Sequence, residues 1–122
     1  MARILIADDS DAIRLVLRDV IEIGHHQVVG EATNGTEAVK MFESSNPDVV
    51  LLDIAMPKKD GLAALKEIIA KDPKAKIIMI TASDNLKTIN DCITVGALAY
   101  ILKPFDFEDV LRSINMALDK RL

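Results

Sequence analysis

Five side chains that could do chemistry follow short apolar runs of the sequence: Asp8, Asp9, Asp53, Thr81 and Lys103. Two negative charges about 4 Å apart repel by ~4 kcal/mol at an effective dielectric constant near 20, so clustered carboxylates need a cation or a shared proton. Oxygen ligands select a hard ion, and Mg²⁺ is suitable because it binds carboxylates and also accepts phosphate oxygens. Once its charge is neutralised, Asp53 could attack phosphorus, with Thr81 and Lys103 as phosphate ligands.

The elements that must position these groups are predicted from hydrophobic patterning. Short β-branched runs alternate five times with stretches of helical period, which is typical of βα units around a parallel sheet. We expect strands at Arg3–Ala7, Gln27–Ala32, Val49–Asp53, Ile77–Thr81 and Ala99–Lys103. Their apolar runs are continuous, which indicates helices on both faces of the sheet. Ligands bind beyond the carboxyl ends of such strands, so the reactive residues are expected at one edge.

The stretches between the strands have one apolar face each. In the first and last helices these faces consist of Ile13, Val16, Leu17, Val20 and Ile21, and of Phe107, Val110, Leu111, Ile114 and Leu118. Asn34 with Glu37, and Asp106 with Asp109, have the spacing of helix N-terminal caps. The fourth helix, expected at 84–95, has a thin apolar face.

Length and charge exclude several classes of protein. The 122 residues, with a net charge of -4, predict one domain over 1–122 and no direct nucleic-acid partner. We find neither a signal peptide nor an apolar stretch of the ~20 residues that a membrane span requires. The single Cys92 cannot form an internal disulfide, and we expect a buried filler there. These observations predict a cytoplasmic protein without membrane insertion.

The motifs together resemble the receiver domain of two-component response regulators, of the single-domain chemotaxis and phosphorelay type (CheY-like). The resemblance covers the whole chain and is carried by Asp8-Asp9, residues 53–61, Thr81-Ala82 and Lys103-Pro104-Phe105. It implies an α/β fold that is doubly wound and flavodoxin-like, (βα)5, with a five-stranded parallel sheet in the order 2-1-3-4-5 and helices on both faces.

The resemblance also implies roles for the acidic residues. Asp53 would accept a phosphoryl group from the phosphohistidine of a histidine kinase or histidine phosphotransfer protein. Asp9, Asp53 and the backbone carbonyl of Ala55 would bind Mg²⁺, while Asp8 would hold a metal-bound water. Lys103 would form a salt bridge with the phosphate, and its bond to Pro104 is expected to be cis. Such a protein is not a turnover enzyme, but it catalyses its own phosphorylation and slow autodephosphorylation.

Thr81 and Tyr100 would be the switch pair, since they correspond to the hydroxyl and aromatic residues that move on phosphorylation in similar proteins. The output surface would be the fourth helix, fifth strand and fifth helix. Its exposed candidates are Lys87, Asn90, Asp91, Thr94 and Tyr100. The expected target is a motor switch or an adaptor, and the expected state is a monomer or a weak phosphorylation-dependent dimer.

Two positions depart from the familiar pattern and bear on the phosphoryl lifetime. Ala55 and Ser83 stand where similar proteins tune the attack of water on the acyl phosphate, and neither is acidic or an amide. Without a carboxamide to orient the water, we expect slower self-dephosphorylation than in fast chemotaxis members.

Other interpretations stay open at this stage. Asp8, Asp9 or Asp53 taken singly is more simply a helix cap. The chain could be the receiver of a longer transcriptional regulator, a flavodoxin-like cofactor-binding protein or an aspartyl-phosphate phosphatase. The phosphatase is disfavoured by Ala55, where a second Asp would be expected. The pair His25-His26 reads as a surface turn rather than a zinc site.

Overall fold

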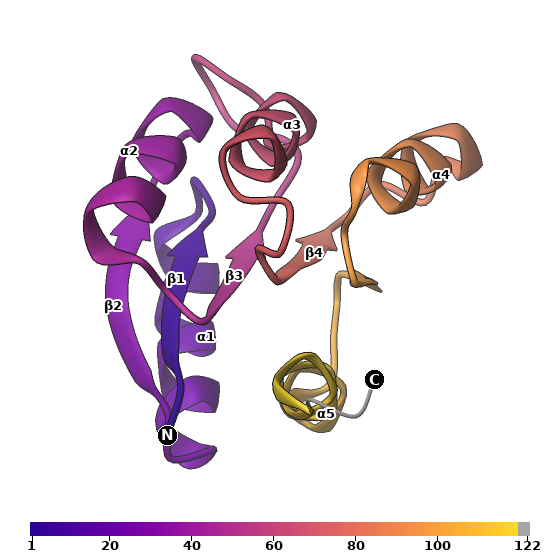
Figure 1. Cartoon of the computed structure of the whole chain (residues 1–122). Coiled ribbons are helices and arrows are strands. Elements are labelled where there is room, and N and C mark those ends of the chain that lie inside the picture. The colour runs from indigo at the N-terminus through magenta and orange to yellow at the C-terminus, as the bar shows by residue number, and fades with distance from the viewer. Residues whose placement is uncertain (120–122) are drawn as a thin grey trace.

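Five parallel strands form the centre of the computed structural model, which describes residues 1–119. The elements are β1 (Arg3–Ala7), α1 (Asp11–Ile23), β2 (Gln27–Ala32), α2 (Gly35–Ser45), β3 (Val49–Leu52), α3 (Gly61–Lys71), β4 (Ile77–Thr81), α4 (Leu86–Val95), β5 (Ala99–Leu102) and α5 (Phe107–Leu118). The sheet order is β2-β1-β3-β4-β5, which confirms the predicted topology (Figure 1). Strands β3 and β5 end one residue before their predicted ends, and α4 begins two residues late.

The two faces of the sheet carry separate hydrophobic clusters. Leu5 and Ala7 of β1 pack in the cluster that includes side chains of α2, α3 and α4, whereas Ile4 and Ile6 pack in the cluster with α1 and α5. Figure 1 shows these two groups of helices on opposite sides of the strands. Because successive strand residues point to opposite faces, and both faces are covered, the strands can be apolar throughout.

The N-cap of α1 is not one of the acids that follow β1. Ser10 caps α1, since its hydroxyl oxygen accepts the N–H of Ile13 at 3.2 Å, so neither Asp8 nor Asp9 is the cap. The predicted Asn34 cap is confirmed, with its side-chain oxygen 2.9 Å from the N–H of Glu37.

Two expectations about α5 are not met in full. Asp106 is the N-cap residue, as its position predicted, but its side chain accepts no capping hydrogen bond, and the carboxylate of Asp109 pairs with Arg112 at 2.7 Å. Phe107 is 48% exposed, because it lies in the first turn of α5, ahead of the buried residues Val110 and Ile114.

The burial of Cys92 and of the pair His25-His26 can be compared with the sequence expectations. Cys92 is buried, as expected, and is the one residue of α4 that is fully buried. His25 is exposed, but His26 is half-buried and its Nδ1 accepts the N–H of Ala2 at 3.0 Å, so it is more than a surface turn. Within residues 1–119, none of the helices combines the length and hydrophobicity needed to cross a membrane.

Candidate functional site

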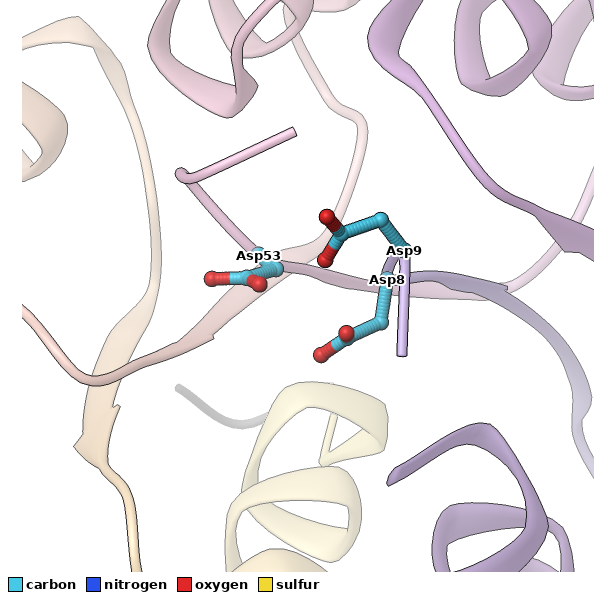
Figure 2. Close-up of side chains that lie close together, drawn as sticks. All are labelled: Asp8, Asp9 and Asp53. Atoms are coloured by element: carbon cyan, nitrogen blue, oxygen red, sulfur yellow. The ribbon is translucent and has the colours of Figure 1, made fainter. Parts of the chain in front are cut away.

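The carboxyl ends of β1 and β3 bring three carboxylates together (Figure 2). These strands are neighbours, with Ala7 opposite Leu52, so the residues that follow them meet at the edge of the sheet. Oxygen atoms of Asp8, Asp9 and Asp53 all lie within 4.8 Å of one another. Asp8 and Asp53 are buried, while Asp9 is exposed. Strong mutual repulsion is therefore built into this edge.

Lys103, which follows β5, supplies the opposing charge. Its Nζ donates to Oδ2 of Asp8 at 2.7 Å and to Oδ2 of Asp53 at 3.2 Å. Burial by itself would lower the pKa of Lys103, but the hydrogen bond to Asp8 and the two negative charges outweigh it and leave that pKa raised. The backbone N–H of Lys103 also donates to the carbonyl of Thr81 at 2.9 Å. The bond from Lys103 to Pro104 is cis, as the resemblance implied.

The three acids differ in how their oxygens are used. Oδ1 of Asp8 accepts the N–H of Ser10 at 2.9 Å, and Oδ1 of Asp53 accepts the N–H of Ile54 at 2.7 Å. With Lys103 on their other oxygens, both buried carboxylates are held in place. The carboxylate of Asp9 makes no hydrogen bond or ion pair with the residues that the structure describes. Asp9 is therefore the carboxylate most available to an added cation.

Two glycines allow the loop after β3 to fold back tightly. Gly61 donates its N–H to the carbonyl of Ile54 at 2.8 Å, and a Cβ there would lie 1.9 Å from the carbonyl oxygen of Asp53. Gly35, at the start of α2, donates to the carbonyl of Lys59 at 2.9 Å, and a Cβ there would lie 2.2 Å from that oxygen. Only residues without a side chain permit these approaches. They fix the course of the loop that contains Ala55, which is exposed.

The predicted switch residues lie on the two strands beyond β3. Thr81 is the buried last residue of β4. Tyr100 of β5 is half-buried, and its hydroxyl donates to the carbonyl of Ser83 at 2.7 Å. Burial raises the pKa of Tyr100. The sequence suggested separate roles for Ser83 and Tyr100, and the bond that joins them was missed because the two residues are far apart in the chain.

The donor set at this edge fits Mg²⁺. The group consists of carboxylates alone, without histidine or cysteine, which is the chemistry of a site for a hard cation. Asp9 and Asp53 offer oxygen atoms from adjacent strands, and Asp8 lies beside them. Within the described chain, no other group of three or more potential metal ligands was found.

The doubly wound sheet and its acidic, lysine-paired edge define a class of protein, the receivers of the flavodoxin-like α/β folds. Comparison with known proteins agrees. The model of the response regulator receiver domain matches residues 4–115, and the chain belongs to this family.

Individual relatives come from chemotaxis and from transcriptional regulation. The chemotaxis protein CheY of Listeria monocytogenes is 43% identical over 96% of this chain and 98% of that protein. The transcriptional regulatory protein PdtaR of Mycobacterium tuberculosis is 36% identical over 97% of this chain but only 57% of its own length. A chain in the crystal structure of the CheX–CheY–BeF3–Mg²⁺ complex from Borrelia burgdorferi superposes with a TM-score of 0.93, at 34% identity, covering 97% of this chain and 90% of that chain.

Charge repulsion at the edge predicts that Asp9→Asn stabilises the protein in magnesium-free buffer. Asp9 repels the other two acids and has no partner to lose, so the melting temperature should rise by roughly 2–5 °C. Thermal unfolding followed by circular dichroism measures the change. Asp19→Asn is the matched control, because Asp19 is also exposed and lies on α1. A melting temperature for Asp9→Asn no higher than that of Asp19→Asn would show that the repulsion is negligible.

Proposed function

We propose that Asp53 is the phosphoryl acceptor of a two-component phosphorelay. The observation that carries this proposal is its setting: a buried carboxylate at a strand end, beside two further acids and 3.2 Å from the ammonium of Lys103. A buried carboxylate in a purely structural role would pair with the lysine alone. The two neighbouring acids, Asp8 and Asp9, are explained if the site also binds a cation in addition to the lysine ammonium, and this cation in turn binds the phosphate.

The reaction uses groups that the chain already holds in place. An oxygen of Asp53 forms a bond to phosphorus, the phosphorus–nitrogen bond of the donor phosphohistidine breaks, and its electron pair returns to the partner's imidazole. Lys103 lies where its ammonium can balance the charge gained by Asp53. Thr81, at the end of the adjacent strand, is the proposed hydroxyl donor to the phosphoryl group. The protein would thus catalyse its own modification without turning over a substrate.

Asp9, Asp53 and the carbonyl of Ala55 are the proposed magnesium ligands, with Asp8 holding a metal-bound water. When bound, Mg²⁺ would supply positive charge that neutralises the acids and the incoming phosphoryl oxygens. Asp9 suits a direct ligand because its carboxylate has no other partner among residues 1–119. Asp8 is given the indirect role because it is the acid that Lys103 holds more closely, with Nζ 2.7 Å from Oδ2 of Asp8 and 3.2 Å from Oδ2 of Asp53.

Phosphorylation would be read out through α4, β5 and α5. Converting a population from 1:99 to 99:1 requires about 5.5 kcal/mol of differential stabilisation, which new bonds from Lys103 and Thr81 to the phosphoryl group could provide together with the metal. Tyr100, bonded to the loop between β4 and α4, would transmit the change.

The proposed output surface has the features of a docking site. Large apolar side chains are exposed on or next to these elements: Leu86, Ile93, Leu98, Leu102 and Phe107. Among the residues predicted from the sequence, Lys87, Asn90 and Thr94 are exposed, whereas Tyr100 and Asp91 are partly buried, with Asp91 paired to Lys87 at 3.0 Å. Exposed apolar groups mark protein contacts where they form one continuous patch.

The proposed pathway is chemotaxis, with a histidine kinase or a histidine phosphotransfer protein as donor and a motor switch or adaptor as cytoplasmic target. The near-complete coverage of CheY from Listeria monocytogenes supports it. The likeness to part of PdtaR favours a second candidate, the receiver of a longer transcriptional regulator. Membership of the receiver family argues against the flavin-binding alternative.

Asp53→Asn should abolish covalent phosphorylation, because an amide cannot act as the nucleophile. Intact-mass measurement after incubation with acetyl phosphate and Mg²⁺ detects the adduct, and peptide mapping locates it. Asp19→Asn is expected to be modified like the wild type. A phosphoryl group retained by Asp53→Asn, or mapped to another residue, would refute the assignment of the acceptor.

Ala55→Asn should shorten the phosphoryl lifetime about 3- to 10-fold, since a carboxamide next to the acceptor can orient the attacking water. The decay of phosphorylated protein after removal of the donor measures this lifetime. Ala55→Val, which adds bulk without a polar group, is the control and should not shorten it. An unchanged lifetime in Ala55→Asn would mean that the residue at this position does not control hydrolysis.

A further inference from the structure

The connection from β1 to α1 carries two of the three acids and is held by hydrogen bonds around Asp8. The N–H of Asp8 donates to the carbonyl of Ala32 at 3.0 Å, and its side chain accepts the N–H of Ser10 at 2.9 Å. A third bond comes from α1: Nη1 of Arg14 donates to the carbonyl oxygen of Asp8 at 2.7 Å. Arg14 has no role in the chemistry proposed above.

The guanidinium of Arg14 is itself fixed by acids on either side. It pairs with Asp11 of the same helix, and its Nε lies 3.4 Å from Oε1 of Glu31 on β2. Its side chain is only 13% exposed. Glu31 is in turn held by Arg18, through two bonds of 3.0 Å. A planar group with several partners has one orientation, so its bond to the Asp8 carbonyl is fixed in direction as well as in length.

That carbonyl belongs to the peptide plane that joins Asp8 to Asp9. Since a peptide bond is planar, holding its oxygen also holds the nitrogen of Asp9. Asp9 needs this support, because its carboxylate has no partner of its own among residues 1–119.

We propose that Arg14 is a positioning residue, which fixes the Asp8–Asp9 peptide and thereby aims the carboxylate of Asp9 at the magnesium site. This inference rests on the proposed function. The positioning role and simple electrostatics predict opposite changes in magnesium affinity when Arg14 is replaced. The positive charge of Arg14 repels Mg²⁺, so losing the charge alone would tighten magnesium binding. Losing the support of the peptide would weaken it, because Asp9 would have to be ordered by the metal.

Arg18 offers a matched control for this test. It lies on the same helix, carries the same charge and shares Glu31 as a partner, but it donates no hydrogen bond to the Asp8 carbonyl. Arg14→Met and Arg18→Met each remove one positive charge and keep an unbranched side chain about as long as the arginine stem up to Nε. Arg14→Lys keeps the charge, but its donors sit on a single nitrogen and cannot reach all the partners of the guanidinium.

Magnesium affinity is measured by titrating MgCl2 into ¹⁵N-labelled protein and following amide chemical shifts, whose dispersion also shows that each variant is folded. We expect Arg14→Met to bind Mg²⁺ about tenfold more weakly than the wild type, the low end of the ~10–100-fold effects seen for residues behind metal ligands. Arg18→Met should bind as tightly as the wild type or slightly more tightly. Arg14→Lys should lie between the wild type and Arg14→Met.

An Arg14→Met protein that binds Mg²⁺ as tightly as Arg18→Met would overturn the positioning role and leave the proposed function standing. If Arg14→Met does not fold, Arg14→Lys decides, because an affinity equal to that of the wild type would overturn the role. Failure of the wild-type protein itself to bind Mg²⁺ would remove the proposed function and this inference together.

Discussion

Three carboxylates at the edge of one sheet repel each other, and the structure tolerates them because Lys103 lies between two of them. Its Nζ is within hydrogen-bond distance of both Asp8 and Asp53, at the far end of the sequence from the first strand. One ammonium cannot neutralise three acids, so Asp9 is left uncompensated. The edge is therefore set to attract a further cation, and this remaining charge underlies the proposed phosphoryl chemistry.

The rest of the fold serves to keep these charges in place. Two apolar clusters, one on each face, pack helices against the sheet whose strand ends carry the acids. Figure 1 shows helices on both sides of the strands. Gly35 and Gly61 let the loop after β3 approach the backbone closely enough to return beside Asp53. By contrast, α4 buries only Cys92 completely, so within the described chain this helix of the proposed output side has fewer buried residues than any other helix.

The resemblance to receiver domains predicted the sheet order, which no local pattern contains. The meeting of Asp8, Asp9, Asp53 and Lys103 followed from the sequence itself, because apolar strands and the residues at their carboxyl ends are local patterns. The sequence did not predict contacts made across the fold. The hydrogen bond from Tyr100 to the Ser83 carbonyl and the ion pair between Arg14 and Glu31 join residues whose spacing in the sequence matches no helix or turn pattern. The Asp106 cap failed because spacing predicts a position, not the rotamer of a side chain. The chemical roles assigned at the edge stay predictions.

The dependence of acetyl phosphate labelling on magnesium concentration tests the central claim most directly. If a divalent cation must offset the acidic edge before Asp53 can attack phosphorus, the labelling rate of the wild-type protein should be negligible with EDTA. It should then rise with Mg²⁺ and saturate at the concentration that saturates the amide shifts. Labelling at full rate in the presence of EDTA would contradict the account.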